Sequence, residues 1–177
     1  MMTRREFIKV AGAGVLAVSC AGMLSGCDVV DSIKEELEDQ GAAKATISNV
    51  TFMMETSAVQ SGTGSGFIGY STLFHVRNKS SDSVTIPKEK ITGVIYDLAG
   101  NEYAMKYTGK DIEVEKDSGK VEIEDFALKT IEEVSSDSSL KNVKYKKAII
   151  TIEYKGKKAV FTDDDENNTI TPKVVNA

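Results

Sequence analysis

The chain has 177 residues, with 22 basic and 27 acidic side chains, a formal net charge of −5, two cysteines and one histidine. An acidic surface disfavours nucleic acid and anionic lipid headgroups as partners. Two cysteines exclude a disulfide-rich scaffold, so a hydrophobic core has to stabilise the domain.

The N-terminal residues have the pattern of an export signal. The run Thr3 to Lys9 contains the pair Arg4 and Arg5, followed by Phe7. It resembles the twin-arginine export signal, in which Ser or Thr precedes two Arg, any residue, Phe and an aliphatic residue. The apolar segment from Val10 to Leu24 is rich in Gly and Ala and too short for a stable transmembrane helix. The resemblance implies that export machinery recognises Arg4, Arg5 and Phe7.

The end of this segment carries a second motif. Leu24-Ser25-Gly26-Cys27 resembles a bacterial lipoprotein box, in which small residues before the Cys let a peptidase reach the bond. The resemblance implies that a signal peptide, residues 1–26, is removed and that Cys27 is lipidated with a diacylglycerol. Two acyl chains give stable anchoring. We therefore expect a protein anchored to a bacterial cell membrane on its extracytoplasmic face; an uncleaved membrane anchor is the alternative.

Residues 27–44 are predicted to form a lipid-anchored linker. This acidic segment has Ile33 and Leu37 at helical spacing, but an apolar stripe of two residues supports only a marginal helix. The leader holds three of the basic residues and one of the acidic ones, so its removal leaves a more acidic chain. We expect the linker to hold the domain away from the bilayer.

From Ala45 the pattern changes to that of β-strands. The segment Ala45 to Met54 is rich in β-branched and aromatic residues, and Gly66 to Asn78 alternates apolar with polar side chains. Ser57 to Gly66 is predicted to be a loop. Further strands are expected at Ser83–Pro87, Ile91–Asp97, Glu102–Tyr107, Asp111–Glu115, Val121–Leu128, Lys146–Tyr154 and Lys157–Phe161.

Turn residues connect these strands. Asp97 to Asn101 predicts one hairpin, and Lys155-Gly156 predicts another, in which the Gly supplies a positive φ. Lys129 to Leu140 is polar and predicts a loop. Residues 163–177 are expected to form an acidic, frayed C-terminal tail. Short strands at this spacing, without a long amphipathic helix, predict an all-β fold with two antiparallel sheets.

The segment from Tyr70 to Glu102 carries a resemblance. The residues that carry the resemblance are Val76-Arg77-Asn78-Lys79-Ser80-Ser81-Asp82, then Val84 to Pro87, and then Ile95-Tyr96-Asp97 with Gly100. The segment is similar to immunoglobulin-like domains of unknown function found in bacterial lipoproteins. The resemblance implies an immunoglobulin-like β-sandwich over residues 45–162. Its motifs make turns, so it implies little about activity.

The sequence offers no credible catalytic or cofactor site. His75, the single histidine, lies within a predicted strand, where a structural role is expected. The glycine run from Gly62 to Gly66 lacks the spacing of a dinucleotide site. Paired carboxylates leave hydrolase activity as a distant alternative. We expect no enzyme activity and no cofactor.

One weak metal candidate exists near the C-terminus. Asp163, Asp165 and Asn167 occupy the first three odd positions of a calcium loop. The sixth position is Asn168 instead of Gly, and the twelfth is Val174 instead of Glu. A solvated acidic tail is therefore the preferred interpretation.

These observations favour a membrane-anchored, non-enzymatic interaction or envelope-accessory module. Its expected partners are the membrane, through the lipid anchor, and a protein of the cell envelope. The alternative is a lipoprotein that binds a small ligand such as a sugar or peptide. A deep pocket near Tyr70, Tyr96 or Tyr103 would favour that alternative. The sequence leaves the oligomeric state open.

Overall fold

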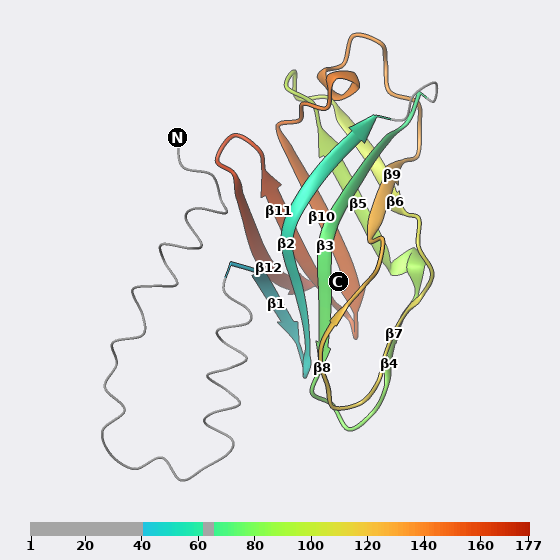
Figure 1. Cartoon of the computed structure of the whole chain (residues 1–177), viewed down its shortest axis with the longest axis vertical. Coiled ribbons are helices and arrows are strands. Elements are labelled where there is room, and N and C mark those ends of the chain that lie inside the picture. The colour runs from blue at the N-terminus through green and yellow to red at the C-terminus, as the bar shows by residue number, and fades with distance from the viewer. Residues whose placement is uncertain (1–40, 62–65) are drawn as a thin grey trace, which may run out of the picture. The chain divides into compact units, whose positions relative to one another are not determined.

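Antiparallel strands make up most of the described chain, which confirms the predicted all-β class. The computed structural model describes residues 41–61 and 66–177, with 59% strand and 5% helix (Figure 1). The strands are β1 Ala43–Ile47, β2 Val50–Ser61, β3 Ile68–Asn78, β4 Val84–Ile86, β5 Ile91–Tyr96, β6 Glu102–Tyr107, β7 Ile112–Val114, β8 Ser118–Glu122, β9 Ala127–Thr130, β10 Lys147–Tyr154, β11 Lys157–Asp164 and β12 Thr169–Asn176. Two short 3-10 helices, η1 Lys88–Lys90 and η2 Ser139–Asn142, lie in connections.

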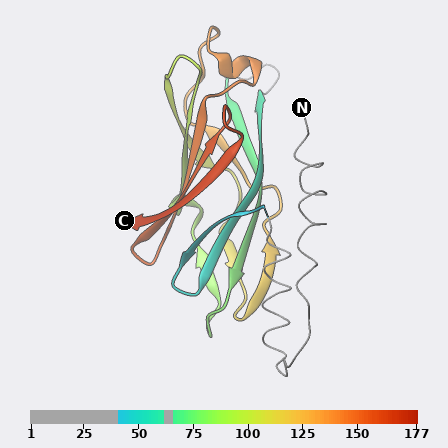
Figure 2. The ribbon, with the colours of Figure 1, turned by 90° about the vertical axis from the view of Figure 1, so that its left-hand side faces the viewer.

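The main sheet curls into an almost closed barrel. Its strands follow the order β1-β2-β3-β9-β6-β5-β10-β11-β12, with β8 also paired to β3, while β4 and β7 form a separate ribbon. The first and last strands, β1 and β12, approach each other without a shared ladder. Because every ladder along the path is antiparallel, β1 and β12 run in the same direction, as the arrows in Figure 1 show. Figure 2 views the curled sheet from the side.

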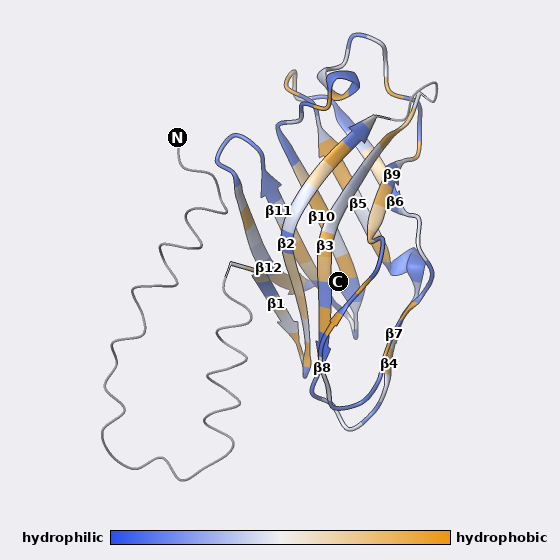
Figure 3. Ribbon diagram, in the orientation of Figure 1, coloured by the Kyte–Doolittle hydropathy of each residue, from blue (hydrophilic) through white to orange (hydrophobic). Residues whose placement is uncertain are grey.

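The core lies between β1–β3 on one side and β5, β10 and β11 on the other. The ring of Phe52 on β2 meets Tyr154 of β10 edge-on, with centroids 6.2 Å apart. Phe74 on β3 meets Phe161 of β11 at the same distance. Figure 3 shows hydrophobic residues along the strands and hydrophilic ones in turns such as β11–β12. Burying each of these large side chains contributes about 1.5–3 kcal/mol.

The two predicted hairpins are present. The turn between β5 and β6 closes at Asp97, whose carbonyl accepts a hydrogen bond from Gly100 at 3.0 Å. The turn between β10 and β11 has positive φ at both Lys155 (46°) and Gly156 (69°). A two-residue turn with positive φ at both positions matches the twist of the strands that it joins.

Asn78 organises the turn that follows β3, as the polar run after it predicts. Its side chain is fully buried. Its Nδ2 donates to the carbonyls of Asp82 at 2.8 Å and Glu115 at 3.0 Å, and its Oδ1 accepts from the Ser80 backbone N–H at 3.0 Å. One side chain thus ties the end of β3 to the β4–β7 ribbon.

Several predicted boundaries are wrong. The segment Ala45 to Met54 is a hairpin of β1 and β2, and β2 continues to Ser61 through much of the predicted loop. The predicted strand Val121 to Leu128 is divided between β8 and β9, because Asp125 has a positive φ of 52° between them.

The C-terminal boundary also changes. Residues 163–177 are not a frayed tail: β11 extends through Asp164, and β12 pairs with it from Thr169 to Asn176. The ladder satisfies backbone groups that a frayed tail would leave to water. At the other end, β1 begins within the predicted linker, and the compact unit spans Ala42 to Ala177.

Candidate functional site

A buried carboxylate with three hydroxyl donors is the most distinctive polar cluster of the interior. Oδ2 of Asp163 accepts hydrogen bonds from Ser57 Oγ at 2.5 Å, Tyr145 OH at 2.7 Å and Tyr70 OH at 2.9 Å. Asp163 is 2% exposed. The rings of Tyr70 and Tyr145 meet edge-on at 6.4 Å. The cluster joins β2, β3 and β11 with the segment that precedes β10.

Strand alternation and one bulge bring these groups together. In β11, Ala159, Phe161 and Asp163 occupy alternate inward positions. In β2, the register shifts between Met54 and Ser57, so that Ser57 pairs with Thr72 and faces inward. Without the extra residue, Ser57 would point away from the core.

The two phenols of this cluster have raised pKa values. Burial raises the pKa of Tyr70 far above its ordinary value of 10.0, and the charge of Asp163 adds to the effect. Burial also raises the pKa of Tyr145 well above the ordinary range, with a further contribution from its hydrogen bond to Asp163. Both phenols therefore remain neutral donors at physiological pH. The cluster can tie strands together, but it presents no exposed nucleophile.

The residues of the calcium candidate point in different directions. Asp163 faces the interior and is occupied by the three hydroxyls, whereas Asp165 and Asn167 lie exposed in the β11–β12 turn. Asn167 donates to Asp164 from its backbone N–H at 3.1 Å and from Nδ2 at 2.9 Å. Within residues 41–61 and 66–177, no group of three or more His, Cys, Asp and Glu side chains could hold a metal ion.

His75 lies in a small charged cluster on the face of β3 opposite Phe74. Its Nδ1 is 3.4 Å from Oε1 of Glu55, and its Nε2 is 3.9 Å from Oε2 of Glu122. The same Glu55 oxygen lies 2.5 Å from Nζ of Lys120. His75 is buried. Glu55 and Lys120 form an ion pair between β2 and β8, and the His75 imidazole of β3 lies beside this pair. These residues include no hydroxyl or thiol nucleophile.

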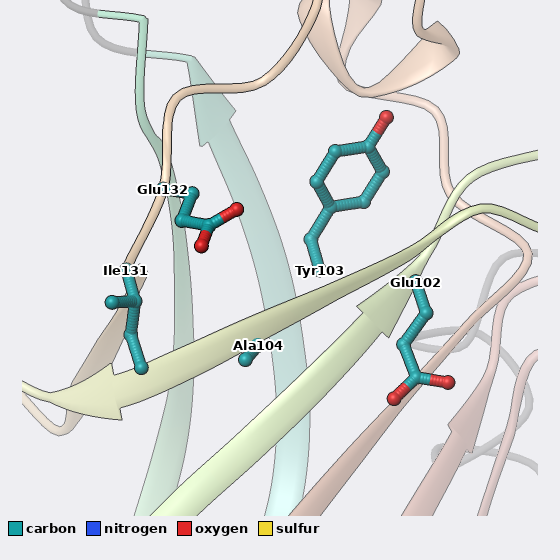
Figure 4. Close-up of a pocket in the computed structure, with 5 residues that line it drawn as sticks. All are labelled: Glu102, Tyr103, Ala104, Ile131 and Glu132. Atoms are coloured by element: carbon teal, nitrogen blue, oxygen red, sulfur yellow. The ribbon is translucent and has the colours of Figure 1, made fainter.

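An open pocket of about 350 Å³ lies beside the start of β6. Its lining consists of Glu102, Tyr103, Ala104, Ile131 and Glu132 (Figure 4). Tyr103 and Glu102 extend to opposite sides of β6, as strand alternation requires, and Tyr103 also packs against the core. Two carboxylates and one phenol would favour a cationic or hydroxyl-rich ligand.

Tyr70, Tyr96 and Tyr103, near which a deep pocket would favour a small ligand, lie in different environments. Tyr70 is inside the core, and Tyr103 lines the open pocket. Tyr96 lies on the outer face of β5, where Nζ of Lys147 is 4.5 Å from its ring centroid and its hydroxyl donates to Glu102 at 3.1 Å. The fold therefore does not bring them into one site.

The sequence reasoning missed Asp163 as a core residue, although a signal existed. Extending the alternation of Ala159 and Phe161 by one step predicts that Asp163 faces inward. Ser57 and Tyr145 had no such signal, because a bulge sets the orientation of Ser57 and a loop delivers Tyr145.

The export and lipidation residues Arg4, Arg5, Phe7 and Cys27 lie outside the described residues. Within residues 41–61 and 66–177, no helix is long and apolar enough to cross a membrane. No known protein-family model matches the chain. No curated protein matches it either.

Proposed function

We propose that the protein is an extracytoplasmic lipoprotein, anchored to a bacterial membrane through Cys27, whose β-domain acts as a non-enzymatic interaction module of the cell envelope. The observation that carries the proposal is the filled interior of the domain. Aromatic and aliphatic side chains from both layers occupy it, including Phe52, Phe74 and Phe161. A domain packed in this way offers its outer surface, rather than an internal cavity, to a partner.

We further propose that the domain is a variant of the immunoglobulin-like sandwich. Two groups of strands face each other across one core, which is the arrangement of such a sandwich. β9 pairs with both β3 and β6 and so joins the two groups along one edge. This strand accounts for the barrel-like curl of the sheet.

Membrane fractionation tests the anchor. In bacteria that produce the full chain, we expect the wild-type protein in the membrane fraction and Cys27→Ala in the soluble fraction, since the acyl chains supply the binding energy. Replacing both arginines, Arg4→Lys and Arg5→Lys, should keep the uncleaved chain in the cytoplasm. Membrane retention of Cys27→Ala would contradict the lipoprotein proposal.

Co-purification tests the interaction role. Wild type and Cys27→Ala are recovered from detergent extracts of the same cells, and the proteins enriched by each are compared. A protein enriched by the anchored form supports the proposal. Recovery of neither form with any partner would count against it.

The pocket at Tyr103 favours a second candidate function, the binding of a small cationic or hydroxyl-rich ligand. Titration calorimetry with polyamines and sugars tests this function, with Glu132→Gln as the pocket variant and Glu166→Gln as an exposed acidic control. Binding that Glu132→Gln weakens and Glu166→Gln leaves unchanged would favour this candidate over the interaction module.

A further inference from the structure

The outer face of β6, β5, β10, β11 and β12 presents three regular rows of side chains. The residues between them along each strand, such as Ile95, Ile150 and Phe161, point into the core, so the rows point outward. The strand register aligns the middle row as Ala104, Val94, Ile149, Thr162 and Thr171. None of these five side chains is charged, and the row crosses all five strands.

The two rows beside it carry different charges. On one side the register aligns Glu102, Tyr96, Lys147, Asp164 and Thr169. On the other side it aligns Lys106, Thr92, Thr151, Val160 and Lys173. The first row has a net negative charge and the second a net positive one. The face therefore changes sign across its uncharged middle row.

We propose that this face is the interface of a homodimer, in which a second copy of the chain packs with its two-fold axis along the middle row. Such an axis brings the negative row of one copy against the positive row of the other. On β6 it pairs Glu102 with Lys106 of the second copy. Residues on the axis, Ile149 and Thr162 among them, meet their own counterparts.

The charges select this axis over the other two-fold arrangement of the same face. An axis along the strands would superpose β6 of one copy on β12 of the other. Lys106 would then face Lys173 of the second copy, and like charges placed opposite each other are destabilising. Only the axis along the middle row pairs the positive row with the negative one.

The size of the face predicts a weak dimer. Five strands about 4.8 Å apart and three rows about 6.8 Å apart span roughly 500 Å² per copy, so the dimer would bury roughly 1,000 Å². That area lies at the lower end for specific interfaces. Membrane attachment, where the anchor proposed above is present, would raise the local concentration of the chain. The dimer itself does not depend on that anchor.

Cysteine cross-linking with a short bis-maleimide reagent, in cells that produce the full chain, tests the axis. Ile149→Cys should form a covalent dimer with this reagent, because its counterpart lies directly opposite at the spacing of about 10 Å between packed sheets, which a direct disulfide would not span. Thr85→Cys, an exposed strand position on β4, is the matched control, and we expect about tenfold less dimer from it. The unsubstituted chain measures the background from Cys20 and Cys27. If Ile149→Cys lowers the amount of protein, Thr162→Cys carries the same expectation.

Mixed cross-linking tests the charge pairing. Glu102→Cys alone should not cross-link, since its counterpart lies about 14 Å away along the strand direction. Co-produced Glu102→Cys and Lys106→Cys should cross-link with each other. In the Ile149→Cys background, Lys106→Glu should lower the dimer yield about threefold or more, and adding Glu102→Lys should restore it. Either of two results would overturn the proposal. In the first, Ile149→Cys gives no more covalent dimer than Thr85→Cys. In the second, co-produced Glu102→Cys and Lys106→Cys give no more covalent dimer than Glu102→Cys alone.

Discussion

The hydroxyl of Tyr70 on β3 donates a hydrogen bond across the core to Oδ2 of Asp163 on β11, over 2.9 Å. β3 and β11 are not neighbours in the sheet, so this bond connects its two opposing sides. A buried carboxylate costs several kcal/mol to desolvate unless hydrogen bonds replace its water. Ser57 and Tyr145 supply the remaining donors to the same oxygen. The cluster consequently links strands from both sides of the core through one acidic side chain.

Asp163→Ala should lower the free energy of unfolding by about 3 kcal/mol, because three buried hydroxyls lose their acceptor. Urea denaturation followed by circular dichroism measures the change. Glu166→Ala removes an exposed acid from the adjacent turn and should change the stability by less than about 0.5 kcal/mol. Equal stabilities of the two variants would show that the cluster contributes nothing to the fold.

Stability should fall as the pH rises above about 10. Tyr70 and Tyr145 have raised pKa values in the folded protein, so there they stay neutral when the same residues in the unfolded chain lose their protons. The unfolded state then binds fewer protons, and stability decreases with pH. Urea midpoints at several pH values between about 8 and about 11 measure this slope. The double variant Tyr70→Phe, Tyr145→Phe should have a shallower slope; an unchanged slope would be inconsistent with the raised pKa values.

Asn78→Ala should destabilise the domain by about 2–4 kcal/mol. The Glu115 carbonyl and the Ser80 N–H lose the amide group that pairs with them, and the Asp82 carbonyl loses one of its two donors. Asn142→Ala, at an exposed position in η2, serves as the control. Thermal unfolding of both variants is the measurement. A melting temperature for Asn78→Ala that equals that of the control would rule out this role for Asn78.

Gly93→Ala should lower the free energy of unfolding by about 1–3 kcal/mol, because the added methyl group overpacks the core. A Cβ at Gly93 would lie 2.8 Å from Cδ2 of Leu128, 2.9 Å from Cε of Met105 and 3.2 Å from the carbonyl oxygen of Ile149. Gly119 has nothing within 4 Å of the same atom, so Gly119→Ala should be tolerated. Chemical denaturation measures the free energy of unfolding of both variants. Equal losses of stability in Gly93→Ala and Gly119→Ala would show that β5 can move away from its neighbours.

Local patterns sufficed for part of the fold. The hairpins at Asp97 and Lys155-Gly156 and the turn at Asn78 were predictable, because neighbouring residues alone satisfy their backbone groups. The pairing of β7 with β4 was not predictable, because β8 is nearer to β7 in the chain and local pattern favours adjacent strands. Strand β12 was also not predicted, because the sequence around it is polar and acidic, as in a disordered tail. Its strand conformation follows from its pairing with β11.

The sequence by itself determined the all-β class and the turns at Asn78, Asp97 and Lys155-Gly156, since both depend on side-chain periodicity and local backbone preference. It also carries the leader motifs at Arg4, Arg5 and Cys27. Only the tertiary structure decided that Tyr70, Ser57 and Tyr145 surround Asp163. The tertiary structure alone placed Glu102 and Lys147 in one row of the outer sheet face, and Lys106 and Lys173 in another. Register and bulges arise from contacts between distant segments, and a single local pattern does not encode them.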